Sequence, residues 1–221
     1  MQTRKAFVIY CVAYVTVLAS MGMLLALYPK LELHLLLNSH HTHLQDVFFT
    51  YYSMVAEGPI YALALLPLLW KKLKLTVFFG LCELTGGSIL QLLKHTICMP
   101  RPISAFEGHA DMVLPVVQGV SLNHGNSFPS GHASTFFVFF TCCALLLAYR
   151  YRQRTEQGQC CYMTRVTLCA APLLLLVMAA LGAYSRVYLS QHFLSDVCMG
   201  SLIGFLTTCI LFHFARRKLL G

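Results

Sequence analysis

Charged residues are scarce in this sequence of 221 residues. They make up 11% of it, against roughly 25% in ordinary soluble domains. Asp and Glu together number only 8, whereas hydrophobic residues account for 57% of the chain. This balance argues against a soluble globule with an unusually apolar core, and it favours an integral membrane protein.

Several motifs of well-known site classes are also missing. The ten cysteines include no Cys-x-x-Cys pair and no spacing typical of a zinc site, so we expect them to be mostly small apolar fillers. No Cys is followed by Arg after five intervening residues, and no Asp-x-Asp occurs. Two common phosphatase chemistries, the cysteine-based and the aspartate-plus-magnesium types, therefore lack their nucleophile motifs.

Long apolar runs are present instead. The first, residues 6–27, would form about 33 Å of helix, enough to cross a hydrocarbon core of about 30 Å. A cleaved signal peptide is an alternative for this run, but its length favours an uncleaved first helix. We expect an all-α, six-transmembrane-helix bundle in a single domain over residues 1–221. Its helices should lie at roughly 6–27, 52–70, 75–94, 132–149, 166–184 and 196–214.

The cations give this bundle an orientation. Six helices place both termini and the loops after the second and fourth helices on one side, which then collects twelve of the 16 Lys and Arg residues. By the positive-inside rule that side is cytoplasmic. The net charge of +8 is thus explained by topology, without nucleic acid as a partner. The opposite face keeps only Lys30, Lys94, Arg101 and Arg186.

The first polar stretch at that face is Lys94-(six residues)-Arg101-Pro102. Pro100 and Pro102 should keep the helix from continuing through this loop, so that Arg101 can turn back toward Lys94. Two cations could then converge on one anion. The alternative is that both side chains are interfacial anchors reaching toward water.

The second stretch, Pro129-Ser130-Gly131-His132, leads directly into an apolar run. Backbone N–H groups at the start of such a helix form a natural anion site, and His132 would face it from the first turn. A simple helix cap at Ser130 is the other reading.

The third stretch is Ser185-Arg186-(five residues)-His192-(three residues)-Asp196. A spacing of four puts His192 and Asp196 on one helix face, where the carboxylate can accept one ring N–H and leave the other nitrogen as a nucleophile or base. A purely structural His–Asp pair is possible for this stretch alone. The three stretches would lie in outer catalytic loops over residues 95–131 and 185–195, and ionisable groups at a membrane face are usually functional.

Together these stretches resemble the signature of the type 2 phosphatidic acid phosphatase family, which also includes vanadium haloperoxidases. No motif position departs from it. The resemblance implies that His192 attacks phosphorus to form a phosphohistidine, that Asp196 orients it, and that His132 protonates the leaving oxygen and later activates water. The phosphoryl oxygens would be bound by Lys94, Arg101, Ser130, Gly131 and Arg186. It implies no metal ion or other cofactor, since fixed cations stabilise the charge.

We therefore expect a phosphatase with its site on the non-cytoplasmic membrane face, acting on a lipid phosphate or diphosphate. The resemblance offers undecaprenyl diphosphate, lipid A, phosphatidylglycerophosphate and phosphatidic acid as substrates. Small size and short loops favour a bacterial inner membrane with a periplasmic site, with a eukaryotic luminal location as the alternative. No obligatory protein partner is evident. A phosphotransferase using the same site and a non-enzymatic lipid transporter are the alternatives, although a transporter would leave His132, His192 and Asp196 without a task.

Four further features carry less weight. His40, His41 and His43 suggest a metal site, but an exposed interfacial loop is the preferred interpretation. Glu83 should be buried in the membrane and bonded to a neighbouring helix. Residues 103–128 form a long outer loop that could act as a lid, and residues 30–51 suggest an interfacial helix.

Overall fold

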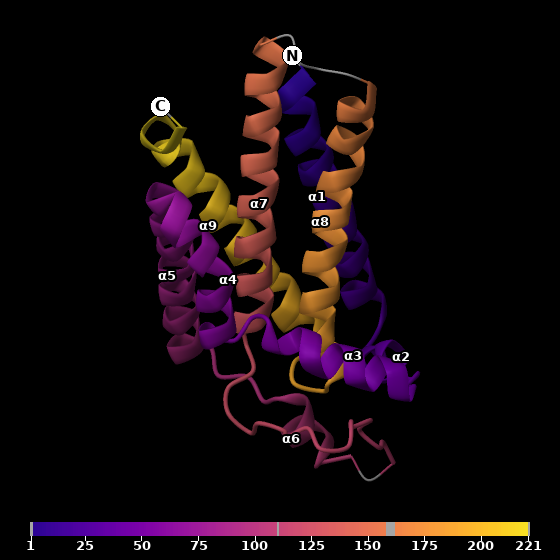
Figure 1. Ribbon diagram of the computed structural model, residues 1–221. Helices are drawn as coiled ribbons and strands as arrows, with labels where there is room; N and C mark the ends of the chain where they lie inside the picture. Colours follow the sequence, from indigo (N-terminus) through magenta and orange to yellow (C-terminus); the bar gives the residue numbers. More distant parts are fainter. Residues whose placement is uncertain (1, 110, 158–161, 221) are drawn as a thin grey trace.

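The computed structural model describes residues 2–109, 111–157 and 162–220. Within these ranges all regular secondary structure is α-helical (Figure 1). The helices are α1 (Gln2–Leu27), α2 (Lys30–Leu37), α3 (His43–Met54), α4 (Gly58–Lys71), α5 (Leu73–Thr96), α6 (Pro102–Phe106), α7 (Gly131–Glu156), α8 (Tyr162–Tyr188) and α9 (Leu194–Leu220).

Five of these helices are long and apolar enough to cross a membrane, counting only the described part of the chain. The spans are Phe7–Leu27, Leu73–Thr96, Gly131–Tyr151, Ala170–Tyr188 and Leu194–Ala215. The prediction of an all-α membrane bundle is therefore confirmed. The predicted count of six full spans is wrong by one.

The missing span is the helix expected over residues 52–70, which the structure divides. α3 ends at Met54 and α4 begins at Gly58. Pro59 lacks an N–H and clashes with the preceding turn, so it disfavours a continuous helix but fits the first turn of a new one. The apolar part of α4, Gly58–Pro67, has only ten residues, about 15 Å of helix. α4 still leads the chain back to the start of α5, so both termini lie at the same end of the bundle (Figure 1).

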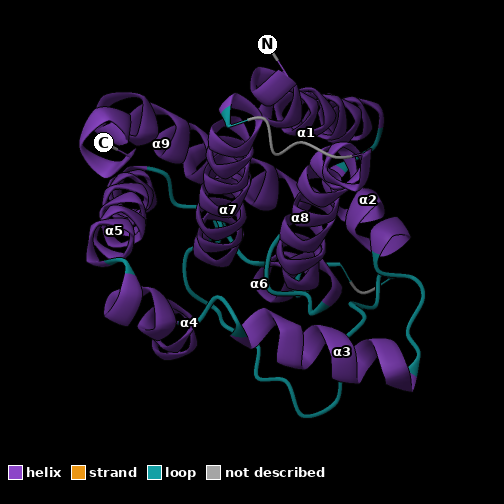
Figure 2. Ribbon diagram, turned by 45° about the horizontal axis from the view of Figure 1, so that its top comes forward, coloured by secondary structure: helices purple, strands orange, loops and turns teal. Residues whose placement is uncertain are grey.

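α7 stands at the centre of the bundle, packed against α1, α5, α8 and α9 (Figure 2). Its contact with α9 is very close at two glycines one turn apart. A Cβ on Gly200 would lie 2.2 Å from the carbonyl oxygen of Ser130, and one on Gly204 would lie 2.4 Å from that of Ser134. Small residues at this spacing let two membrane helices approach backbone to backbone. The first turns of α7 and α9 are thereby held together.

The end of the bundle opposite the termini, called the loop end below, carries the remaining elements. α2 and α3 run across it, and α6 lies beyond them in the connection between α5 and α7 (Figure 1). The interfacial helix expected over residues 30–51 is thus two helices. The Oγ1 atom of Thr42 caps α3 by accepting a hydrogen bond from the backbone N–H of Gln45 at 3.3 Å. These helices and loops enclose the three polar stretches.

Candidate active site

The structure brings the three polar stretches together at the loop end. Lys94 lies in the last turn of α5 and Arg101 immediately precedes α6. Ser130 precedes α7, whose first two residues are Gly131 and His132. Arg186 lies in the last turn of α8, His192 in the following loop, and Asp196 in the first turn of α9. His132 is within electrostatic range of Arg186, His192, Arg101 and Lys94, which shows the convergence.

Backbone hydrogen bonds fix the second and third stretches relative to each other. The N–H of Ser130 donates to the carbonyl oxygen of Asp196 at 3.0 Å, and that of His192 donates to the carbonyl of Arg186 at 3.0 Å. Ser130, His192 and Asp196 are each at most 2% exposed. In a site this enclosed, electrostatic interactions are stronger than they would be in water.

His192 and Asp196 lie close together, but they do not share a helix face as predicted, because His192 lies in the loop before α9, which begins at Leu194. They also do not form a short direct hydrogen bond. The Nδ1 atom of His192 lies 3.5 Å from Oδ2 of Asp196, beyond the usual range for such a bond. The Ser127 hydroxyl lies beside both atoms: it donates to Oδ2 at 2.5 Å and lies 3.3 Å from Nδ1. The expected two-residue pair is therefore a three-residue arrangement in this structure.

Both arginines present an unused donor. The Nη1 atom of Arg101 donates to the carbonyl oxygen of Gln191 at 2.9 Å, which directs the guanidinium to the loop that carries His192. The Nε–H groups of Arg101 and Arg186 are buried and have no hydrogen-bond partner within the described residues. Burying a polar group without a partner is costly, so these donors fit a ligand that accepts hydrogen bonds. A phosphoryl group meets that requirement.

The connection from α5 to α7 holds the cations of the first stretch in place. The side-chain amide of Asn126 donates to the carbonyl oxygens of Lys94 at 2.5 Å and Ile97 at 2.8 Å. Its Oδ1 accepts the N–H of Met99 at 3.1 Å, and the N–H of Ser127 donates to the carbonyl of Met99 at 2.9 Å. The loop therefore folds back onto the end of α5, as expected for Lys94 and Arg101.

The start of α7 supports both readings of Ser130. Its Oγ lies 3.4 Å from the N–H of Ala133, the geometry of a weak helix cap. His132 in the first turn of α7 is within electrostatic range of Arg101 and Arg186, and the positive end of a helix favours an anion. Capping and anion binding are compatible at this position.

Burial shifts the pKa values of His192 and Arg101, the two ionisable groups of the site that lie outside the membrane spans. Desolvation lowers the pKa of His192 from its ordinary 6.5 to about 4, with Asp196 opposing the shift and Arg101 adding to it. The imidazole is consequently neutral near pH 7 and keeps a lone pair. Desolvation also lowers the pKa of Arg101 from 12.5, and Asp196 opposes this change, so the guanidinium stays charged.

Three polar residues of the site were not found from the sequence. Ser127 and Asn126 lie just before the second stretch, and Gln191 precedes the proposed nucleophile. The Oε1 atom of Gln191 is within 3.3 Å of the Asn123 amide nitrogen, and its Nε2 donates to the carbonyl of Ser121 at 2.9 Å. Isolated Ser, Asn and Gln residues in loops carry no spacing pattern, so only the folded contacts reveal them.

The remaining sequence features have structural roles in the described part of the chain. His41 bonds Asp46 through Nδ1 and Asn38 through Nε2, both at 3.0 Å, and no group of three potential metal ligands occurs among the described residues. His40 and His43 are exposed, the position that an interfacial loop would give them. Glu83 accepts a hydrogen bond from Thr135 of α7 at 2.5 Å, as expected for a carboxyl group that bonds a neighbouring helix.

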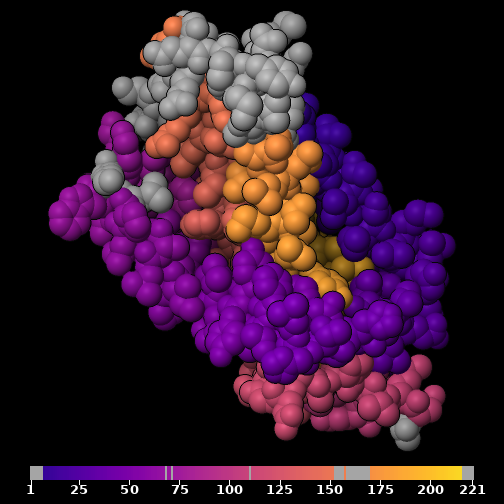
Figure 3. All heavy atoms as spheres, turned by 45° about the vertical axis from the view of Figure 1, so that its right-hand side comes forward, coloured from indigo at the N-terminus to yellow at the C-terminus, as the bar shows by residue number. Residues whose placement is uncertain are grey.

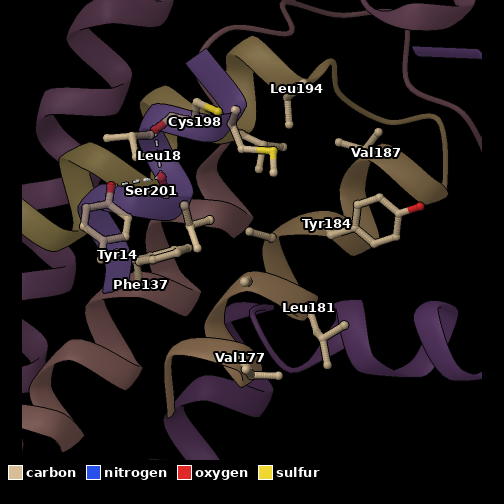
Figure 4. Close-up of a pocket in the computed structure, with 15 residues that line it drawn as sticks. Tyr14, Leu18, Phe137, Val177, Leu181, Tyr184, Val187, Leu194, Cys198 and Ser201 are labelled. Atoms are coloured by element: carbon tan, nitrogen blue, oxygen red, sulfur yellow. Dashed lines mark hydrogen bonds between the residues drawn. The ribbon is translucent and has the colours of Figure 1, made fainter. Parts of the chain in front are cut away.

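A separate hollow faces the bilayer. A cavity of about 320 Å³ lies between α1, α8 and α9 and is lined almost wholly by apolar side chains (Figure 4). Figure 3 shows it as a gap between α1 and α8 through which α9 is visible. Leu194, Val197 and Cys198 line it from one face of α9, whereas Asp196 points to the other side. None of the eight predicted site residues lines this hollow.

Comparisons with known proteins agree with this arrangement. None of the curated proteins matches the chain. Among solved structures, LpxE from Aquifex aeolicus matches with a TM-score of 0.61 and 23% identity, over 83% of this chain and 94% of that one. The model of the PAP2 superfamily matches residues 74–219, which include all three polar stretches. The chain is an integral membrane protein and belongs to the PAP2 superfamily.

Proposed function

We propose that this protein is a phosphatase that hydrolyses the phosphate monoester or diphosphate headgroup of a membrane lipid through a phosphohistidine. The observation that carries the proposal is the position of His192, a buried neutral imidazole beside two arginines with unpartnered buried Nε–H groups. Such a site offers a nucleophile and fixed positive charge at one point, the two requirements of phosphoryl transfer.

In the first step the Nε2 lone pair of His192 forms a bond to phosphorus while the bond from phosphorus to the leaving oxygen breaks. His132 gives its proton to that oxygen. The three other oxygens are held, as their charge builds, by Lys94, Arg101 and Arg186, by the Ser130 hydroxyl and by the N–H of Gly131. In the second step water attacks phosphorus, His132 takes a proton from it, and the P–N bond breaks to restore His192 and release phosphate.

Fixed cations take the place that a metal ion has in many other phosphatases, so this mechanism needs none. Activity should survive an excess of chelator, and vanadate should inhibit by mimicking the transition state. Loss of activity in chelator, with recovery on adding magnesium or zinc, would contradict the metal-free mechanism.

The position of the site supports a lipid substrate. All three stretches abut helix ends, so a phosphoryl group there lies at headgroup depth while its hydrocarbon chains remain in the bilayer. Undecaprenyl diphosphate, lipid A, phosphatidylglycerophosphate and phosphatidic acid are the candidates to test. We further propose a bacterial inner membrane with the site in the periplasm, because twelve cations fall at the opposite end of the bundle.

The test is phosphate release by the purified chain from each candidate lipid and from a short-chain soluble phosphate, in water enriched in ¹⁸O. Hydrolysis places one ¹⁸O in each released phosphate, whereas phosphotransfer yields a new phosphorylated acceptor with none. A His192→Gln variant, which should retain the fold, is the control. Absence of release and transfer with every lipid would contradict the proposal, and a non-enzymatic lipid transporter would then fit better.

A further inference from the structure

Ser127, in the loop before α7, contacts both the proposed nucleophile His192 and the carboxylate of Asp196. Its hydroxyl lies 2.5 Å from Oδ2 of Asp196 and 3.3 Å from Nδ1 of His192, whereas those two atoms are 3.5 Å apart. Ser127 is fully buried, so solvent does not compete for these contacts. A hydroxyl can donate one hydrogen bond and accept another, which allows it to serve both neighbours at once.

The other bonds of Asp196 settle the direction of these contacts. Its Oδ2 also accepts the N–H of Phe193 at 3.0 Å, and its Oδ1 accepts the hydroxyl of Ser195 at 3.0 Å. A carboxylate surrounded by donors is an acceptor only, so the Ser127 proton points to Oδ2. The lone pairs of Ser127 Oγ are then left for a proton on Nδ1 of His192.

We propose that Ser127 is a positioning residue that couples Asp196 to His192 through the relay Nδ1–H to Oγ, and Oγ–H to Oδ2. The relay fixes the proton of His192 on Nδ1 and leaves Nε2 as the free nucleophilic nitrogen. This inference rests on the proposed function, since it names the group that prepares the proposed nucleophile.

The relay also matters after the attack. When Nε2 bonds to phosphorus the ring becomes positively charged, and Nδ1–H becomes a stronger donor. The hydrogen bonds through Ser127 let the buried carboxylate of Asp196 stabilise that charge without movement of the His192 ring or of α9. No proton leaves the relay, so His192 returns unchanged when the P–N bond breaks.

The support for Ser127 comes from another element than the residues it joins. His192 and Asp196 belong to the α8–α9 loop and α9, whereas the N–H of Ser127 is bonded to Met99 in the α5–α7 connection. The same connection carries Arg101 and is tied by Asn126 to the end of α5. The nucleophile is thus oriented only when the loop that supplies the phosphate-binding cation is in place.

The first test reads the tautomer directly and requires no substrate. In ¹⁵N-histidine-labelled protein in detergent, a long-range ¹H–¹⁵N spectrum distinguishes the two neutral tautomers, and His192 is identified by the signal lost in His192→Gln. We expect the Nδ1–H tautomer in the unsubstituted chain and in Ser127→Thr, which keeps the hydroxyl. Ser127→Ala should show a mixture of tautomers or the Nε2–H form.

The second test separates turnover from binding. Ser127→Ala should lower kcat by about 10–100-fold, by analogy with the loss of an outer hydrogen-bond partner from a metal-binding histidine, which has a similar orienting role. KM should change little, because the Ser127 hydroxyl is already engaged by Asp196 and His192 and has no assigned role in binding the phosphoryl group. Ser195→Ala is the matched control: it removes a hydroxyl from the same carboxylate at Oδ1, and should cost about fivefold or less, the worth of one ordinary hydrogen bond.

Thermal melting of each variant distinguishes activity lost through misfolding from activity lost with the relay. If Ser127→Ala melts far below the unsubstituted chain, Ser127→Thr and its spectrum decide the matter. A pure Nδ1–H tautomer and unchanged kcat in folded Ser127→Ala would overturn the proposal, as would equal losses in Ser127→Ala and Ser195→Ala. Failure of the unsubstituted chain to act on any lipid would instead overturn the phosphatase function, and the spectrum would still decide the relay.

Discussion

The two faces of α9 differ in how tightly they are packed. Toward α7, Gly200 and Gly204 leave no room for a Cβ, and the backbone and side chain of Asp196 are engaged by Ser130, Ser127 and Phe193. Toward α1 and α8, the same helix borders an apolar cavity of about 320 Å³. The fold therefore concentrates close packing on the face that positions the proposed nucleophile.

This contrast has a physical basis. Phosphoryl transfer depends on reacting groups being held within a fraction of an ångström. The face of α9 that supports the site must therefore be closely packed. A face that meets the bilayer needs no such fit, because hydrocarbon chains adapt to its shape. Substitutions on the two faces should accordingly have very different effects.

The largest effect is expected from His192 itself. His192→Ala removes the attacking atom, so phosphate release should fall to background while expression and melting temperature stay near those of the unsubstituted chain. Phosphate release from the lipid panel is the measurement. Near-normal release by this variant would refute the assignment of His192 as the nucleophile.

His132→Ala should have the next largest effect. Loss of a general acid slows a reaction by about 10²–10⁴-fold. A substrate with a good leaving group, such as a nitrophenyl phosphate, needs less protonation and should lose less, in the first step, than a lipid phosphate does. Equal losses for both leaving groups would argue that His132 only binds the phosphoryl group.

Gly200→Ala tests the packing itself. Its Cβ would lie 2.2 Å from the carbonyl oxygen of Ser130, so α7 and α9 must separate. We expect a destabilisation of about 1–3 kcal/mol, the usual range for overpacking, and a loss of activity because Ser130 and Asp196 move apart. Gly22→Ala on α1, where no atom lies within 4 Å of the new Cβ, is the control and should melt normally.

The pH dependence of kcat/KM tests whether the closely packed side of the site keeps His192 buried and neutral. Since burial lowers the pKa of His192 to about 4, the acid limb of kcat/KM should lie nearer pH 4 than 6.5. Arg101→Ala should shift this limb to higher pH, because Arg101 helps to lower that pKa.

The lowered pKa of His192 also makes the stability of the fold depend on pH. His192 contributes stability that is complete above about pH 6.5 and is lost as the pH falls toward 4. An acid limb near 6.5 in the unsubstituted chain would contradict the buried neutral imidazole.

The smallest effect is expected in the cavity. Ala180→Leu adds apolar atoms to its lining on α8, where there is space for them. The melting temperature should change by only a few degrees, equivalent to about 1 kcal/mol or less. Gly182→Ala on the same helix is the contrasting variant, because its Cβ would lie 2.4 Å from the ring of Phe136. A similar loss of stability in both variants would remove the distinction between the tight and loose regions.

Much of the site was evident from the sequence. Lys94, Arg101, His132, Arg186 and His192 could be assigned to one site because they belong to three polar stretches that stand near the ends of apolar runs and together resemble one family signature. Membrane helices are also fixed largely by composition, since any polar backbone group in lipid must be bonded within its own helix. For these reasons the sequence alone determined an all-α membrane bundle with the polar stretches at one face.

The tertiary structure decided what depends on contacts between distant segments. Pro59 and the short run after it divide the expected second span, and their effect depends on how α3 and α4 pack. Ser127 lies 65 residues before His192 in the sequence, so no local spacing links the two. Helix periodicity predicted one helix face for His192 and Asp196, but His192 lies in the loop before α9. Its distance from Asp196, and the nearby Ser127 hydroxyl, follow from how this loop packs against the start of α7.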